Sequence, residues 1–319
     1  MAYQKNQTTN DEILILGFEG LSNYKIPLFL LLLVLYTFTS TENFLIIFLV
    51  SKNPRLHSPM YILISNLLFC EVVYTTDLVP LMLHHILAER AVIYHLGCSL
   101  QLTISGGVTV VETLLLMLMS VDRYLAVCKP LRYSVLMHNR LCLSFVIAFW
   151  LISICTNIVM FNFVIHLQLC GNLSIDHFYC DFTPLVALAC SDITPLVSFA
   201  LATSVIATIA PFVIIVLSYA AIIVEILRIR SSTGRQKAFS TCSSHLLVVS
   251  LYFGVIIVFY VVPRSSHYLY VYKAMSFMSF GVTPMVNPII YTLRNKDIKK
   301  ALRITINEIK HQFIDTENS

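Results

Sequence analysis

The strongest constraint on this chain is a series of seven long apolar stretches separated by short polar segments. Each is long enough to cross a bilayer, since a helical span needs about 20 apolar residues. Of 319 residues, 57% are hydrophobic and 12% charged, whereas soluble proteins carry about 25% charged residues. A bilayer must therefore be the solvent, which excludes a disordered, collagen-like or coiled-coil chain and a water-soluble enzyme. The predicted spans cover residues 25–51, 58–86, 96–128, 140–163, 196–227, 237–262 and 268–292.

The basic residues are distributed unevenly between these stretches, and this indicates an orientation. If the N-terminus is outside, sixteen of the 21 lysines and arginines fall in cytoplasmic segments. Lys5, Lys25, Arg90, Arg264 and Lys273 remain outside. Because cytoplasmic loops are enriched in Lys and Arg, we predict a multi-pass protein with an extracellular N-terminus and a cytoplasmic C-terminus.

The two ends of the chain complete an all-α membrane architecture. Residues 1–24 lack the features of a cleaved secretory signal and are predicted to form an extracellular tail. Residues 25–292 form a seven-transmembrane helix bundle, and residues 293–319 a cytoplasmic segment. Apolar residues alternate with Lys and Arg at helical spacing over 296–309, which predicts a short amphipathic helix on the inner membrane surface. A basic tail without regular structure is the alternative.

Cysteines and glycosylation sequons agree with this orientation. Sequons begin at Asn6 in the outer tail and at Asn172 in the longest outer loop. Four outer cysteines allow three disulfide pairings, and the sequence alone does not choose among them. Four of the nine cysteines fall on the outer side, where oxidation occurs: Cys98, Cys170, Cys180 and Cys190.

Short motifs then separate the possible classes of seven-span protein. The sequence DRY at 122–124 closes the third stretch, and NPIIY at 287–291 closes the seventh. Together, at these positions, they resemble the rhodopsin-like (class A) G-protein-coupled receptors over nearly the whole chain. A narrower resemblance, to vertebrate odorant receptors, rests on LHSPMY at 56–61, SVDRYLAVCKPLRY at 120–133, SY at 218–219, KAFSTCSSHL at 237–246 and PIIYTLRN at 288–295.

The odorant-receptor resemblance implies a function. It implies a plasma-membrane receptor, not an enzyme, that binds small, mostly apolar odorants in the outer half of the bundle. It also implies activation of a stimulatory olfactory-type G protein and a rise in cyclic AMP. We keep two alternatives: a non-olfactory class A receptor for a small metabolite, and a membrane transporter, although the inverted repeats and interrupted helices typical of transporters are not visible.

The resemblance also assigns a cytoplasmic switch. Arg123 is always charged and needs a partner, which Asp122 supplies at rest. On activation, Arg123 meets the G protein, with Tyr219 and Tyr291 as hydroxyl partners. Pro288 breaks the helical hydrogen-bond ladder and is a plausible hinge. The full set of expected switch residues is Asp122, Arg123, Tyr124, Tyr219, Asn287, Pro288 and Tyr291.

Two carboxylates fall in the middle of predicted spans, where an ionised side chain costs about 2.5–3.5 kcal/mol. The resemblance implies that Glu71 and Glu112, with Asn287, form a sodium pocket that favours the resting state. Glu71 replaces the usual Asp and reaches one methylene further. Two neutral acids hydrogen-bonded together are the alternative. No other cofactor is expected.

The resemblance further implies the disulfides Cys98–Cys180 and Cys170–Cys190, the first of which would roof a ligand pocket. Tyr260 is the strongest individual candidate for a ligand contact, and Arg264 would receive an acidic odorant unless it is a solvated rim residue. Glu42 and Asp77 are further acids without an assigned role. The pocket expected by analogy is apolar with a few hydroxyls: Ser105, Gly106, Thr109, Val110, Thr203, Ala207, Phe253, Ile256, Ile257, Tyr260, Arg264, Phe277 and Phe280.

Overall fold

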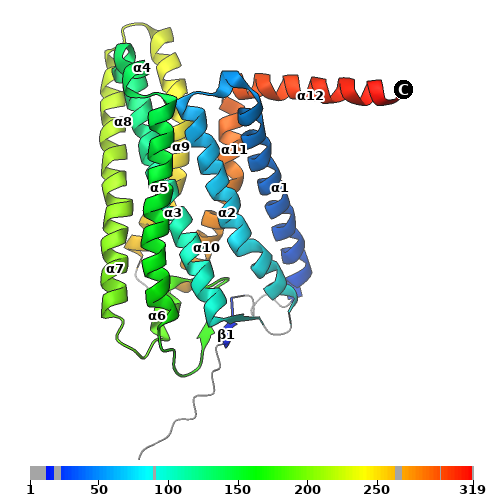
Figure 1. Ribbon diagram of the computed structural model, residues 1–319, viewed down its shortest axis with the longest axis vertical. Coiled ribbons are helices and arrows are strands. Elements are labelled where there is room, and N and C mark those ends of the chain that lie inside the picture. The colour runs from blue at the N-terminus through cyan, green and yellow to red at the C-terminus, as the bar shows by residue number, and fades with distance from the viewer. Residues whose placement is uncertain (1–11, 18–22, 89–90, 263–267, 295, 318–319) are drawn as a thin grey trace, which may run out of the picture.

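The computed structural model describes residues 12–17, 23–88, 91–262, 268–294 and 296–317, and its long helices run side by side as a bundle (Figure 1). Within these ranges, six helical runs are long and apolar enough to cross a membrane. Their apolar composition leaves many large side chains on the outside of the bundle, as expected where lipid is the solvent. The six lie within α1 Lys25–Lys52, α2 Pro59–Leu87, α3 His95–Cys128, α5 Asn139–Ile165, α7 and α8 over Thr194–Arg228, and α9 Ser232–Val261.

The seventh expected span is also helical, although it is interrupted. It consists of α10 Leu269–Phe277, a π-helical turn Met278–Val282 and α11 Thr283–Arg294. The fifth span has the same construction, with α7 Thr194–Ser204 and α8 Ala210–Arg228 joined by a π-helical turn Val205–Ile209. Such turns are rare and shift the faces of a helix relative to a regular α-helix.

The seven-helix fold expected from the sequence is thus confirmed, with small differences in bounds. The sixth span begins at Ser232, before the predicted residue 237, because Ser231 caps it by accepting a hydrogen bond from the Gly234 amide at 3.3 Å. The C-terminal amphipathic helix, α12 Lys296–Glu317, is longer than predicted. It extends sideways from the end of the bundle, as a helix on a membrane surface would (Figure 1).

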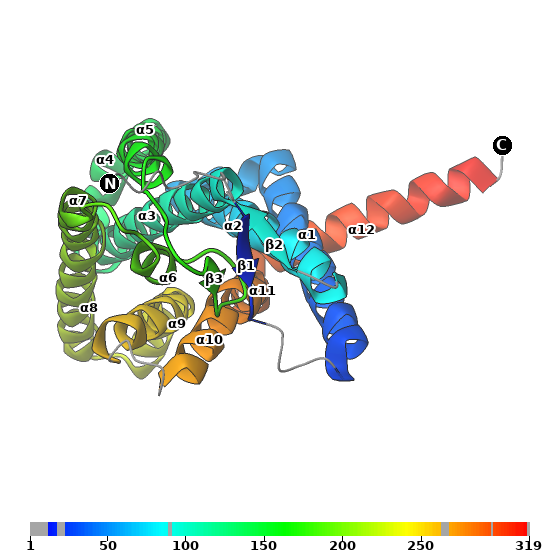
Figure 2. The same cartoon turned by 90° about the horizontal axis from the view of Figure 1, so that it is seen from below.

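Helix α3 holds the bundle together, because it packs against α2, α5 and α8 (Figure 2). Its close approach to α5 depends on Gly107, whose carbonyl accepts a hydrogen bond from Ser153 Oγ at 2.7 Å. On the other side, the Tyr252 hydroxyl of α9 donates to the Thr109 carbonyl at 3.0 Å and lies 2.9 Å from Thr113 Oγ1. Small and hydroxyl-bearing residues thus tie α3 to its neighbours, as is common in membranes.

A small sheet covers the end of the bundle opposite α12. Strand β1 Glu12–Ile15 pairs antiparallel with β2 Val92–Tyr94 and parallel with β3 Ser174–Ile175. The sheet therefore joins the N-terminal segment, the connection before α3 and the long loop after α5. Ile13 and Ile15 are buried beneath it, in an apolar cluster that includes the sulfurs of Cys98 and Cys180.

Four short helical segments lie in the connections between the long helices of the described chain. A 3₁₀ turn Pro54–Leu56 links α1 to α2. A second, Pro130–Arg132, leads into α4 Tyr133–Leu136 after α3. Helix α6 Phe182–Ala187 lies in the long loop after β3, at the same end as the sheet.

Candidate functional site

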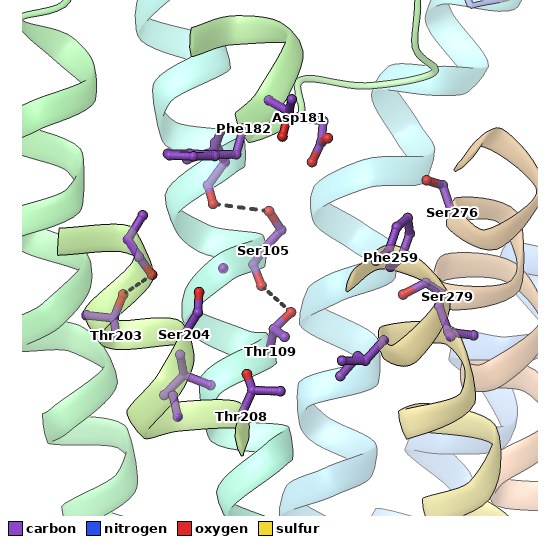
Figure 3. Close-up of a pocket in the computed structure, with 18 of the residues that line it drawn as sticks. Ser105, Thr109, Asp181, Phe182, Thr203, Ser204, Thr208, Phe259, Ser276 and Ser279 are labelled. Atoms are coloured by element: carbon purple, nitrogen blue, oxygen red, sulfur yellow. Dashed lines mark hydrogen bonds between the residues drawn. The ribbon is translucent and has the colours of Figure 1, made fainter. Parts of the chain in front are cut away.

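A cavity of about 1030 Å³ opens inside the bundle below α6 (Figure 3). Helices α3, α5, α7, α9 and α10 form its walls, and its depth reaches Glu71 and Glu112 on α2 and α3. Asp181 and Phe182 lie at its roof in Figure 3, above Ser105 and Thr109. A largely pre-formed, mainly apolar cavity with a few polar groups is typical of small-molecule sites.

The hydroxyl groups of the walls are oriented by their own helices. Ser105, Thr109 and Thr203 donate their protons to carbonyl oxygens one turn back, at 2.7, 2.9 and 2.9 Å (Figure 3). A hydroxyl has one proton and two lone pairs. These three side chains therefore offer acceptor lone pairs to anything that binds beside them.

The structure brings together seven of the thirteen residues expected in the pocket. They come from three spans that are distant in sequence and meet only in the folded bundle. They are Ser105, Gly106, Thr109, Val110, Thr203, Ala207 and Ile256.

Four expected residues lie away from the cavity, and helix geometry explains each. Ile257 follows the lining residue Ile256 by 100° of turn, and its side chain is 46% exposed on the outer surface. Phe253 is buried against Phe212, with ring centroids 4.9 Å apart. Phe277 and Phe280 pack together, edge to face, toward α1 and α2.

The π-helical turn in the seventh span explains why Phe277 and Phe280 do not line the cavity. It changes the face that the helix turns inward, so that Ser276, Ser279 and Thr283 line the cavity instead. The side chain of Tyr260 and the whole of Arg264 lie outside the described residues, as does Asn6.

The sequence analysis missed the roof. Helix α6 contributes Phe182, Thr183, Pro184 and Ala187, and Asp181 precedes it. One signal was available: Asp181 follows Cys180, and a disulfide from Cys180 to α3 must hold the following residues over the bundle. Helix α5 also contributes to the walls, with Asn157 and Met160. Nothing in the sequence indicates that these residues face the cavity.

Above the cavity, charged groups of the long loop meet the seventh span. Lys273 Nζ on α10 lies 2.6 Å from Asp176 Oδ1. His177 is 4% exposed, and its Nε2 lies 3.1 Å from Ser276 Oγ. Burial lowers the pKa of His177 below its ordinary value near 6.5, although Asp181 acts in the opposite direction. The imidazole is therefore neutral at pH 7.

The deep end of the cavity contains the residues of the expected sodium pocket. Asn287 Nδ2 donates a hydrogen bond to Glu71 Oε1. Glu71, Glu112 and Asn287 are all buried. Among the described residues, Glu112 Oε1 and Asn287 Oδ1 have no hydrogen-bond partner. Carboxylate and amide oxygens are the ligands that hard cations prefer, so this donor set fits a sodium ion. Glu71 and Glu112 do not hydrogen-bond to each other there.

At the other end of the bundle, Arg123 is paired with Asp122, the partner that the resemblance implies. Its guanidinium forms an ion pair with Asp122 at 2.5 Å, and the Tyr133 hydroxyl donates to the other oxygen of Asp122 at 2.8 Å. Tyr219 lies not on Arg123 but 2.5 Å from His245 Nδ1 of α9. The Tyr291 hydroxyl is buried and has no partner among the described residues.

Both disulfides implied by the resemblance are present in the structure. Cys98 at the start of α3 pairs with Cys180, which fixes the roof of the cavity. Cys170 pairs with Cys190 within the long loop. The sequon residue Asn172 is exposed between them.

Comparisons with known proteins agree along the whole chain. A family model described as olfactory receptor matches residues 32–308. Olfactory receptor-like protein OLF3 of Canis lupus familiaris is 40% identical over 304 residues, covering 95% of this chain and 96% of that protein. Olfactory receptor 10A7 of Homo sapiens is 39% identical over 311 residues, 98% of each chain. Olfactory receptor 5P55 of Mus musculus is 41% identical over 307 residues, 96% and 98% respectively.

Proposed function

Because the chain belongs to the olfactory receptor family, we propose that it raises cyclic AMP through a stimulatory olfactory-type G protein when an odorant occupies the cavity. Membership makes the chain a non-enzymatic, multi-pass membrane receptor that binds odorants and signals through a G protein. The transporter alternative has no support from these relatives. How ligand binding in the cavity leads to G-protein coupling at Arg123 is inferred from the contacts at the two ends of the bundle.

The observation that carries the proposal is the position of the cavity relative to Arg123. The cavity opens below α6 at one end of the bundle, and the Asp122–Arg123 pair closes α3 at the other. Helix α3 contributes to both, and Tyr252 on α9 contacts α3 and lines the cavity. A ligand that prefers one packing of α3 and α9 shifts the equilibrium by its difference in affinity.

The cytoplasmic step follows from the partners seen at rest. Asp122 holds Arg123 in an ion pair, and the Tyr219–His245 contact holds α8 against α9. When α9 moves away, Arg123 and Tyr219 become available to each other and to the G protein. Tyr291, whose hydroxyl has no partner among the described residues, would be the third member of that arrangement.

We place the protein in the plasma membrane with its N-terminus outside. The disulfides lie at the end of the bundle that carries the sheet, and disulfides persist in oxidising compartments. The exposed sequon residue Asn172 is at this end too, whereas sixteen of the 21 basic residues fall in segments on the side of Arg123.

The test is a cyclic AMP assay in cells that express an olfactory-type stimulatory G protein. Arg123→Ala should abolish basal and odorant-driven signalling while surface display, measured by antibody against an N-terminal tag on unpermeabilised cells, stays normal. Arg55→Ala, an exposed arginine of the first cytoplasmic loop, is the matched control and should signal normally. Full signalling by Arg123→Ala would contradict the proposal, and a tag accessible only after permeabilisation would reverse the orientation.

A further inference from the structure

The acids that line the described part of the cavity have no cationic side chain beside them to balance a charge. Among the described lining residues, the carboxylates are Glu71, Glu112 and Asp181, and no lysine or arginine is present. His177 is the histidine among the described lining residues, and it is neutral at pH 7 because burial lowers its pKa. An ionised carboxylate among low-dielectric walls creates a negative potential around itself.

Asp181 is the acid best placed to meet a ligand. It lies at the roof of the cavity, and in the part of the chain that the structure describes its carboxylate has no hydrogen bond or ion pair (Figure 3). Lys273, the described cation that meets the long loop above the cavity, is paired with Asp176 at 2.6 Å and is absent from the cavity lining. Asp181 therefore keeps an uncompensated charge that faces the cavity.

The groups around Asp181 also lack partners. His177 Nδ1 and Thr183 Oγ1 line the cavity and are buried, with no hydrogen-bond partner among the described residues. When His177 donates from Nε2 to Ser276, its Nδ1 is left as an acceptor. Buried polar atoms without partners are costly, which points to a ligand that satisfies them.

The hydroxyls lower down lead to the same conclusion. The protons of Ser105, Thr109 and Thr203 are committed to backbone carbonyls, so their free valences accept hydrogen bonds. A ligand that suits this cavity must therefore donate protons and carry positive charge. A carboxylate would be repelled by Asp181 and by the lone pairs of these three hydroxyls.

We propose that the cavity selects odorants that carry a protonated aliphatic amine, with the ammonium group bound by Asp181 at the roof and the apolar body directed toward α3 and α9. This inference rests on the proposed function and defines its ligand class. The ammonium donates to the Asp181 carboxylate and to the hydroxyl oxygen of Thr183. The aromatic rings of Phe182 and Phe259 line the same cavity and offer faces that favour a cation.

The experiment compares three ligands with the same carbon body: 2-phenylethylamine, 2-phenylethanol and 3-phenylpropanoate, with cyclohexyl counterparts of each. Cyclic AMP is measured for the full-length receptor at verified surface display. The amines should be at least about tenfold more potent than the alcohols, equivalent to about 1.4 kcal/mol, and the carboxylates inactive. Asp181→Asn, which keeps the shape of the side chain, should raise the half-maximal amine concentration by about tenfold or more and leave the alcohols unchanged.

Asp192→Asn is the matched control, because Asp192 is exposed just before α7, does not line the cavity and accepts a hydrogen bond from the Thr194 amide, which asparagine can also accept. It should leave the amine response within about twofold of the parent. Carboxylates as the most potent class, or an amine response that Asp181→Asn leaves unchanged, would overturn the amine inference while the receptor function stands. Silence toward all three classes, together with basal cyclic AMP that Arg123→Ala does not lower, would count against both proposals.

Discussion

At the deep end of the cavity, two acids are costly to place inside the membrane and are only partly satisfied by hydrogen bonds. An acid in the middle of a span costs about 2.5–3.5 kcal/mol when ionised, and here Glu71 and Glu112 both line the cavity, with the Asn287 amide bonded to Glu71. The Asn287 side chain donates to Glu71 only, which leaves Glu112 Oε1 without a described partner. A sodium ion bound between these oxygens would compensate the charge and stabilise the resting packing.

The residue-scale prediction concerns sodium. Replacing sodium by N-methyl-D-glucamine in the medium should raise basal cyclic AMP of the parent by about fivefold or more, because allosteric couplings typically amount to about 1–3 kcal/mol. Glu112→Gln should remove that dependence while keeping the size of the side chain. Glu42→Gln on α1 makes the same chemical change outside the cavity and serves as control. An unchanged sodium response in Glu112→Gln would exclude this site.

The sequence predicts site residues whose chemical type is unusual in a membrane span. It does not predict the orientation of side chains that depends on helix packing. Glu71 and Glu112 are conspicuous because acids are rare in spans, whereas Ser105 and Thr109 are expected by analogy with odorant receptors. Phe280 is one of many aromatic residues in apolar stretches, and nothing in the sequence shows which way its side chain points. Its orientation toward α1 and α2 depends on a π-helical turn that no local pattern predicts.

At the scale of elements, the pairing of α3 with α5 depends on the absence of a side chain at one position. A Cβ at Gly107 would lie 3.0 Å from Asn157 Nδ2 and 3.1 Å from Ser153 Oγ. Neither atom can move freely, because Ser153 Oγ donates to the Gly107 carbonyl and Asn157 Nδ2 donates to the Ser153 carbonyl at 2.8 Å. At Gly106, a Cβ would find only Asn157 Oδ1 at an ordinary 3.6 Å.

The element-scale prediction follows from that difference between neighbouring glycines. Gly107→Ala should lower the free energy of unfolding by about 1–3 kcal/mol through overpacking, in spite of the better helix propensity of alanine. Gly106→Ala should be neutral or stabilise by up to about 1 kcal/mol. Thermal unfolding of purified receptor in detergent measures both. Equal melting temperatures for the two variants would show that α3 and α5 can separate without cost.

Hydropathy predicted the long helices well, because a span must be apolar over its whole length whatever it packs against. It could not predict strand β1, whose four residues pair with partners about 80 and 160 positions further along the chain. Such pairing depends on non-local contacts and leaves little trace in a short window. For the same reason, the roof formed by α6 is visible only once Cys180 is joined to α3.

At the scale of the whole molecule, the two disulfides make unequal contributions. Cys98–Cys180 closes a loop with a sequence separation of 82, against 20 for Cys170–Cys190. Loop-closure entropy grows with the logarithm of length, so the longer loop gives about 1 kcal/mol more stabilisation. Cys98 and Cys180 are also buried at the centre of the sheet-covered cluster, whereas Cys190 is exposed.

Removing the first bridge should therefore affect both stability and ligand binding. The double variant Cys98→Ala with Cys180→Ala should lose about 2–5 kcal/mol and its odorant response, because Asp181 and α6 are then no longer fixed above the cavity. The variant Cys170→Ala with Cys190→Ala should lose less stability and keep the ligand response. Thermal unfolding and cyclic AMP dose–response curves, compared at equal surface display, test the two variants together. An unaltered odorant potency in the first variant would mean that the β1–β2–β3 sheet alone positions the roof.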